Sequence, residues 1–314
     1  MPGEAKTENS QAAEQAAEKA PRFETIDVLR VAGFVCGVLL FVAAILWARS
    51  REEGWGWGPG LLVLLAVALE GAVVGLTWPR IFLITWRELK GYFISPVAYA
   101  VMAFYFGVCG LIFYLILNQP GAKAEMRDQF GTMYFLLVFM VPILTMRLFS
   151  EERRSGTIEL LMTSPVRDYE VVVGKYLAAV AFLVVMVIIS LQYPIILRAY
   201  SNPDWGPIIA GYVGLLIAGA AFAAVGVFTS VLTKSQVAAA ISAMLILLVF
   251  WLINWLGTHT SGFWSEVCRY LSIPENYEDF RKGIIDTRPI AYFVSLSILF
   301  LFMAVRALEI SRIK

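Results

Sequence analysis

Ionisable residues that could do chemistry are rare in this sequence, because 59% of its 314 residues are hydrophobic and only 16% are charged. Such a composition is typical of membrane proteins. Glu70 is the one ionisable residue deep inside a long apolar segment. A charge at the bilayer centre costs at least ~2.5–3.5 kcal/mol, so this carboxyl group should face protein or be protonated. We favour a polar contact between helices, or a neutral carboxyl group, over a proton or ion site at Glu70.

The sequence offers no second group with which Glu70 could build an active site. An intramembrane enzyme needs convergent polar groups, such as paired acids or several His ligands at membrane depth. His259 is the single histidine, and no disulfide framework is readable from the three cysteines, Cys36, Cys109 and Cys268. We therefore expect no enzymatic activity, no metal site and no cofactor. The net charge of +1 implies no general attraction to nucleic acid.

Gly174 and Lys175 form a Gly-Lys pair within "VVVGKYL", a pairing that also occurs in nucleotide-binding loops. The P-loop pattern G-x-x-x-x-G-K-[ST] requires an upstream glycine and a following Ser or Thr, and this stretch has neither. The chain should therefore not bind or hydrolyse ATP by itself. Any ATPase that drives it must come from another polypeptide.

A charged segment, Ser150–Lys175, separates two long apolar stretches and is much longer than a simple turn. Its four charges Glu151–Arg154 precede Ser155-Gly156-Thr157, which can turn the chain and start a helix. In the "TIELLMT" that follows, three apolar residues share one helical face: Ile158, Leu161 and Met162. Ser164 and Pro165 suit the N-cap and first turn of the next helix. The pattern predicts a short helix lying across the base of a helix bundle like a lever, although a charged loop that only anchors the spans fits equally well.

The elements that must position this segment are membrane spans, since a helix crosses about 30 Å of hydrocarbon with about 20 apolar residues. Eight segments qualify or nearly so: Val31–Ala48, Leu61–Trp78, Val97–Leu117, Phe130–Met146, Tyr176–Leu197, Pro207–Leu232, Gln236–Gly257 and Pro289–Val305. Helices satisfy their own backbone groups in lipid, and the short alternating segments of a barrel do not occur. The sequence therefore predicts an all-α polytopic membrane protein.

The distribution of Lys and Arg predicts the orientation of these spans. With the N-terminus in the cytoplasm, 16 of the 25 basic residues fall on the cytoplasmic side. We therefore expect both termini and the Ser150–Lys175 segment in the cytoplasm. Residues 1–26 have almost no large apolar side chain and no secretory signal, so we favour a disordered cytosolic tail over a partner-docking helix.

The segment Ile81–Ser95 is too short and too charged to span the membrane. On a helix, its large apolar residues fall on one face at 4-3-4 spacing: Phe82, Trp86, Leu89 and Phe93. Such a helix should lie in the membrane interface with its aromatic side toward lipid. Pro96 suits the first turn of the span that follows. We expect an interfacial elbow helix; the alternative is a cytosolic extension of that span.

The longest loop expected on the outside is Thr258–Arg288. Its "FWSEVCRYLSI" stretch has helical spacing, and "PENYEDFRKGIID" follows with mixed charge. These patterns predict an amphipathic helical cap over the external mouth. The cap would be either a gate or docking site for a periplasmic partner, or a passive lid.

Two stretches of the sequence resemble ABC-type-2 permeases, the membrane subunits of one class of ATP-binding-cassette exporter. The first is "ERRSGTIELLMTSPVRDYEVVVGKYLA". The second, "ENYEDFRKGIIDTRPIAYFVSLSILFLFMAVRALE", is similar to the end of the gliding-motility-type permeases, whose relatives include the permease for nitrous-oxide-reductase maturation. The resemblance covers roughly Ile81–Lys314. It implies a six-span core that begins with an elbow helix.

The resemblance also implies how such a core is driven. Glu151–Glu159 would form the coupling helix that enters a cleft on a separate ATP-binding subunit. The residues within the matching motif are Glu151, Glu152, Arg153, Arg154, Ser155, Gly156, Thr157, Ile158 and Glu159. Closure of two such ATP-binding subunits would then tilt the spans of a permease dimer in the bacterial inner membrane.

The N-terminal hairpin departs from the six-span pattern, but two extra spans leave the orientation of the core unchanged. The domains expected are a tail (1–26), an extra transmembrane hairpin (27–79) and a permease core (80–314) with elbow helix 81–95, coupling segment 150–166 and external loop 258–288. We expect a permease subunit that couples ATP hydrolysis to export or mechanical work. The alternative is a structural or mechanotransmission anchor of a surface or maturation machine. The partners implied are the ATP-binding subunit, a second permease copy or paralogue, a periplasmic or auxiliary subunit, and lipid.

Overall fold

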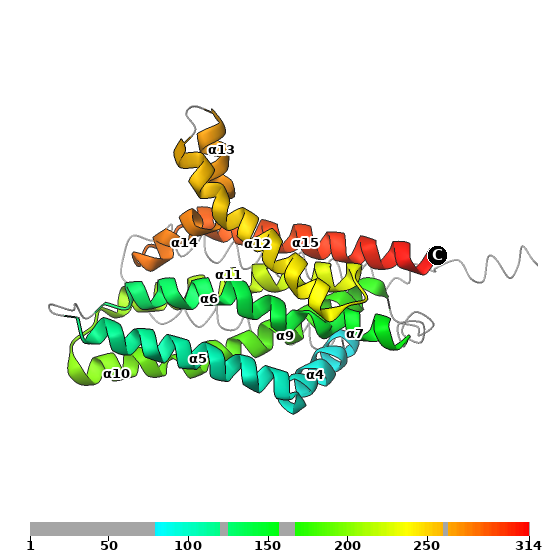
Figure 1. The fold of residues 1–314 in the computed structure, drawn as a ribbon, viewed down its shortest axis with the longest axis horizontal. Helices are drawn as coiled ribbons and strands as arrows, with labels where there is room; N and C mark the ends of the chain where they lie inside the picture. The colour runs from blue at the N-terminus through cyan, green and yellow to red at the C-terminus, as the bar shows by residue number, and fades with distance from the viewer. Residues whose placement is uncertain (1–78, 120–124, 157–166, 260–262, 314) are drawn as a thin grey trace, which may run out of the picture. The chain divides into compact units, whose positions relative to one another are not determined.

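The computed structural model describes residues 79–119, 125–156, 167–259 and 263–313, and every regular element in these ranges is an α-helix (Figure 1). In chain order the helices are α4 Pro79–Ile94, α5 Pro96–Leu117, α6 Arg127–Thr145, α7 Arg147–Ser155, α9 Asp168–Ser190, α10 Gln192–Tyr200, α11 Trp205–Leu232, α12 Gln236–His259, α13 Phe263–Leu271, α14 Ile273–Arg281 and α15 Thr287–Ile313. The expected tail, the hairpin and Glu70 lie outside the described residues, as do Thr157, Ile158 and Glu159. The fold described below is therefore that of the unit beginning at Arg80.

Six segments of the described chain are long and apolar enough to cross a membrane, which confirms the all-α, six-span core. They are Pro96–Leu117, Arg127–Ser155, Asp168–Tyr200, Trp205–Leu232, Gln236–Ile253 and Thr287–Ser311. The helix of the third segment begins at Asp168, ahead of the predicted span Tyr176–Leu197, because its polar first turn continues directly into the apolar run. Lys175 consequently lies inside a helix, two turns from its start.

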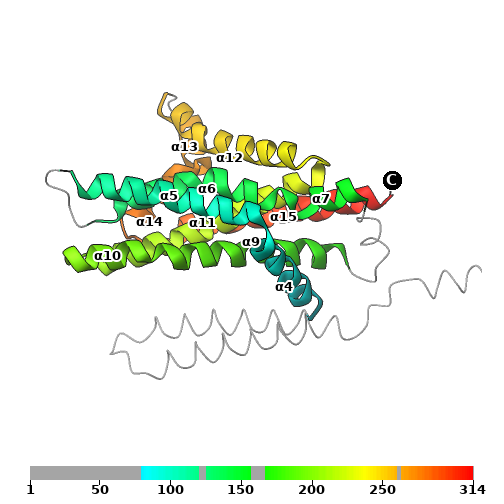
Figure 2. The ribbon, with the colours of Figure 1, turned by 60° about the horizontal axis from the view of Figure 1, so that its bottom comes forward.

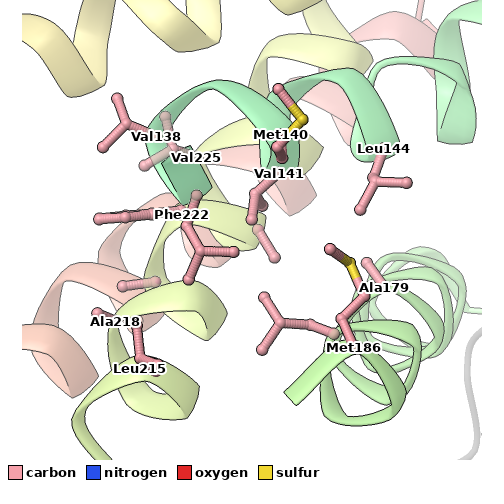
Figure 3. Close-up of a cluster of buried hydrophobic side chains, with 14 of the residues drawn as sticks. Val138, Met140, Val141, Leu144, Ala179, Met186, Leu215, Ala218, Phe222 and Val225 are labelled. Carbon is pink, nitrogen blue, oxygen red and sulfur yellow. The ribbon is translucent and has the colours of Figure 1, made fainter. Parts of the chain in front are cut away.

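Helix α11 is the centre of the bundle. Of the residues in its most apolar window, 72% are buried, against 22% for the windows of α5 and α12. Figure 3 shows apolar side chains of α6, α9 and α11 meeting in this core, among them Val141, Met186 and Phe222. Small residues on α11 let its neighbours approach closely, as at Gly219, where an added Cβ would lie 2.5 Å from a methyl carbon of Leu183.

The two ends of the bundle carry different elements. Figures 1 and 2 place α4, α7 and the end of α15 together at one end, and α10 and α14 at the other. The exposed sides of α5, α12 and α15 present large apolar residues, such as Phe104, Leu245 and Ile298. Such an exterior suits lipid rather than water, as expected for a helix bundle in a membrane.

The loop expected to form a helical cap contains two short helices, α13 and α14. Helix α14 packs against the bundle through Tyr277, whose ring stacks on that of Tyr134 in α6 with centroids 3.8 Å apart. The Tyr134 hydroxyl donates to the carbonyl of Ile273 at 2.9 Å. At the surface, Arg127 of α6 pairs with Glu278 at 2.6 Å. Helix α14 is therefore fixed to the ends of the spans by both buried and exposed contacts.

Candidate functional site

Helix α7 carries the charged residues expected to meet a partner, and it continues α6 after a break at Met146. Pro142 cannot donate a backbone hydrogen bond, which weakens the helix just before the break. Helix α7 ends at Gly156, whose φ of +74° lies in the left-handed region that glycine adopts at little cost. The expected turn is thus confirmed at Gly156. The four charges Glu151–Arg154, however, form the end of a helix rather than a lead-in to one, because nothing interrupts the helix between Arg147 and Gly156.

The start of the next helix also corrects the prediction. The N-cap of α9 is Arg167, and its backbone N–H donates to the Glu170 carboxylate at 3.0 Å. Asp168 and Glu170 place negative charge in the first turn, where the helix dipole favours it. The residues predicted for the N-cap and first turn, Ser164 and Pro165, lie outside the described residues.

Ser230 of α11 holds the break between α6 and α7. The first four N–H groups of a helix lack a partner within that helix. Two of those in α7 donate to Ser230 Oγ, from Phe149 at 3.0 Å and from Ser150 at 3.2 Å. Ser230 Oγ itself donates to the carbonyl of Met146 at 2.8 Å. A single hydroxyl group on a neighbouring helix therefore caps α7 and bridges the break.

One turn earlier on α11, Gly226 brings this helix against the end of α6. A Cβ at position 226 would lie 1.9 Å from the hydroxyl oxygen of Thr145, so any side chain there would displace one of the two helices. Thr145 donates to the carbonyl of Val141 at 2.9 Å, within its own helix. The small residue at 226 therefore permits the close approach that lets Ser230 reach the break.

The elbow helix α4 docks on the bundle through a polar stripe, defined as Thr85, Glu88 and Tyr92 together with Ser95, which lies between α4 and α5. The 3-4 spacing of the first three residues places them on one helical face. Thr85 donates to the carbonyl of Gly174 in α9 at 3.0 Å, and Tyr92 donates to the carbonyl of Leu144 in α6 at 3.0 Å. Arg147 at the start of α7 donates to Ser95 Oγ. The polar stripe thus contacts α6, α7 and α9.

Two features of α4 follow from this docking. Burial raises the pKa of the Tyr92 hydroxyl group, so this group stays protonated and remains a donor. The opposite face exposes Phe82 and Trp86, whose rings stack with centroids 6.5 Å apart. This aromatic face is the one expected to meet the membrane interface.

Lys175 is the centre of the site. Its side chain is 1% exposed, and its ammonium group contacts the Glu152 carboxylate of α7 at 2.8 Å and the Glu88 carboxylate of α4 at 3.3 Å. The same group donates to the carbonyl of Leu148 at 2.6 Å and lies 5.0 Å from the ring centroid of Phe149. A buried cation is costly unless it is paired and hydrogen-bonded, and here both conditions are met. We call Lys175 with Glu88, Glu152 and the Leu148 carbonyl the Lys175 junction.

The Lys175 junction shows which predicted residues come together. Glu152 is brought to Lys175, whereas Glu151, Arg154 and Ser155 are exposed at the end of α7. Sequence reasoning missed Lys175 and Glu88 as site residues. The sequence did contain a signal for Lys175, because this lysine lies between the apolar stretches "VVVG" and "YLAAVAF". An ionisable residue in an apolar helix usually has a specific partner.

The Lys175 junction links three helices, α4, α7 and α9, through one buried ammonium group. No group of three or more His, Cys, Asp or Glu residues that could hold a metal ion occurs in the part of the chain that the structure describes. Helix α7, whose last turn carries exposed charges, follows the break at Met146. Its first turn is hydrogen-bonded to Ser230 of α11, and Glu152 on its side is paired with Lys175 of α9, which also contacts Glu88 of α4. Six spans with a short charged helix at one end define a multi-pass membrane protein.

A family model for the ABC-2 family transporter proteins matches residues 8–306. The chain belongs to this family, whose members are membrane components of ABC transporters and normally work with an ATP-binding subunit. The match begins well before the elbow helix and therefore includes the N-terminal residues ahead of the six described spans. No curated protein matches the chain.

Proposed function

We propose that this protein is the permease subunit of an ABC transporter in which α7 receives the motion of a separate ATP-binding subunit. The observation that supports this role best is the two-sided character of α7. Leu148, Phe149 and Ser150 bury one side of the helix in the bundle, whereas Glu151 and Arg154 are exposed near its C-terminal end. A helix that must dock on a partner and move the spans needs one side for each task.

The wider proposal follows the family and the resemblance of the sequence. Two permease copies, or this chain and a paralogue, would form the transporter in a bacterial inner membrane, with both termini in the cytoplasm. A periplasmic or auxiliary subunit could dock at the opposite end, where α13 and α14 lie. The gliding-motility-type permeases and the nitrous-oxide-reductase maturation permease are the relatives we propose. The work done is export or mechanical work, and the alternative is an anchor that passes force to a surface or maturation machine.

The docking role of α7 can be tested by one charge reversal with a matched control. Arg154→Glu should abolish co-purification of the ATP-binding subunit, because the exposed end of α7 would present the wrong charge. Lys234→Glu changes the net charge equally at an exposed position between α11 and α12 and should leave co-purification unchanged. Equal retention of the ATP-binding subunit by the two variants would contradict the assignment of α7.

Export and anchoring are separated by reconstitution with the co-purified subunit. A transporter shows ATP hydrolysis that depends on the permease and moves a cargo across the vesicle membrane. An anchor shows the same dependence without cargo movement. Mass spectrometry of molecules that co-purify from native membrane would supply the candidate cargoes.

A further inference from the structure

The Lys175 junction joins two helices that no other described ion pair connects. Glu88 lies on the elbow helix α4 and Glu152 on α7, and each contacts the ammonium group of Lys175 on α9. If α4 and α7 moved apart, this 1%-exposed cation would keep only one of its two carboxylates. Breaking a buried pair is far more costly than breaking a pair in water. The electrostatic energy of the junction therefore favours joint movement of α4 and α7.

Two hydrogen bonds also join α4 to the spans, and Arg147, beside the break at Met146, donates to Ser95 directly after α4. Thr85 and Tyr92 each make one hydrogen bond to a carbonyl group of the bundle. Such neutral bonds between membrane helices are individually weak, at about 0.6 kcal/mol on average. The outer face of α4 presents Phe82 and Trp86 away from the bundle. The Lys175 junction thus links α4 by ion pairs to the part of α7 that lies beyond the break at Met146.

Helix α7 can pivot, because the break at Met146 interrupts the helix and Gly156 ends it. Its first turn is attached to α11 only through the hydroxyl group of Ser230, among the hydrogen bonds of the described chain outside the helices. A pivot at Met146 would carry Glu152 with it. Lys175 would follow Glu152, and Glu88 would follow Lys175.

We propose that Lys175 is a positioning residue that makes the elbow helix α4 follow α7 when the ATP-binding subunit displaces α7. This inference rests on the proposed function and extends it to the membrane interface, where the aromatic face of α4 would be moved through the headgroup region. The junction would thereby convert a push from the cytoplasm into movement of a helix lying along the membrane.

The test uses the full-length complex with its co-purified ATP-binding subunit in lipid nanodiscs. Hydrogen–deuterium exchange of α4 and of α7 is measured with and without a non-hydrolysable ATP analogue. Glu88→Gln keeps the shape of the side chain and removes its charge, and Glu88 lies on α4, away from the proposed docking end of α7. Lys90→Gln is the matched control, because Lys90 lies over the ring of Trp86 on the other side of the same helix.

In the wild type and in Lys90→Gln, the nucleotide should change exchange in α4 and α7 together. In Glu88→Gln, α7 should still respond, but the response of α4 should fall by roughly 2- to 30-fold. Glu152→Gln, which removes the other arm of the junction, should reduce the α4 response in the same way. An undiminished α4 response in both variants would overturn the inference and leave the proposed function intact. Failure of α7 to respond in the wild type would instead contradict the proposed function, and the inference with it.

Discussion

Replacing Ser230 by alanine should loosen the start of α7 without disturbing the rest of the bundle. The Ser230 hydroxyl group accepts hydrogen bonds from the backbone N–H groups of Phe149 and Ser150 and donates to the carbonyl of Met146. The Met146 carbonyl would keep a donor, because the Ser150 hydroxyl group also bonds to it. The substitution therefore removes the hydrogen-bond acceptor of the Phe149 and Ser150 N–H groups, which are buried and have no carbonyl one turn earlier in α7.

The size of the effect follows from the number of bonds lost. Hydrogen bonds between membrane helices contribute about 0.6 kcal/mol on average and at most about 1.7 kcal/mol. Two such bonds give roughly 1–3 kcal/mol for local opening of the first turn. Since about 1.4 kcal/mol corresponds to a factor of ten, amide exchange in this turn should accelerate roughly 5- to 150-fold.

The assay is hydrogen–deuterium exchange of the purified protein in lipid nanodiscs, followed in peptides that cover residues 147–155. Ser242→Ala is the control, because the Ser242 hydroxyl group donates only to the carbonyl of Ala239 within its own helix, among the contacts described. We expect acceleration in Ser230→Ala alone. Unchanged exchange in Ser230→Ala, or equal acceleration in both variants, would refute the view that Ser230 caps α7.

Three further predictions concern packing, topology and the N-terminal hairpin. Gly226→Ala should destabilise the bundle by roughly 1–3 kcal/mol, because the new Cβ would lie 1.9 Å from the Thr145 hydroxyl oxygen. The control is Gly107→Ala, whose Cβ would have no neighbour within 4 Å, and it should be neutral or stabilising in the same unfolding titration. In a background lacking Cys36, Cys109 and Cys268, cysteines at Gly121 or Ser261 should react with an impermeant maleimide in intact cells, and one at Ser155 should not; labelling at Ser155 would reverse the orientation. Deletion of Met1–Thr77 should leave an inserted protein that still co-purifies with its ATP-binding subunit, and loss of that subunit from a well-expressed variant would place the hairpin within the functional core.

The spans could be predicted from the sequence because their signal is local. About 20 consecutive apolar residues identify each span regardless of its neighbours, and the predicted Val97–Leu117 differs from helix α5 by one residue. The exposed Phe82 and Trp86 of α4 were predictable for the same reason, whereas Leu89, expected on the same face, packs against the core, and Phe93 contacts Phe182. The N-cap of α9 lies at Arg167 rather than at the predicted Ser164, because Glu170 accepts from the Arg167 backbone N–H and so caps the helix at Arg167.

The site could be predicted only in part, because its contacts join residues far apart in the chain. Glu88 and Lys175 are separated by 87 positions, and no local pattern pairs them. Ser230 resembles any serine in a span, whose hydroxyl group commonly bonds a carbonyl within its own helix. The 3-4 spacing of Thr85, Glu88 and Tyr92 was readable, but only the tertiary structure shows that this side faces protein.

The docking of α4 also sets an order for assembly during synthesis. Glu88 leaves the ribosome 87 residues before the lysine that pairs with it. At the usual rate of about 5–20 residues per second, that interval lasts roughly 4–17 s. Until then, the elbow helix has its aromatic side for the lipid and the Leu144 carbonyl for Tyr92, but it lacks α9 and the Gly174 carbonyl that accepts from Thr85. The docking of α4 is therefore completed only after Lys175 has been made, so a nascent chain that stalls before Lys175 leaves an acidic residue on α4 without its buried partner.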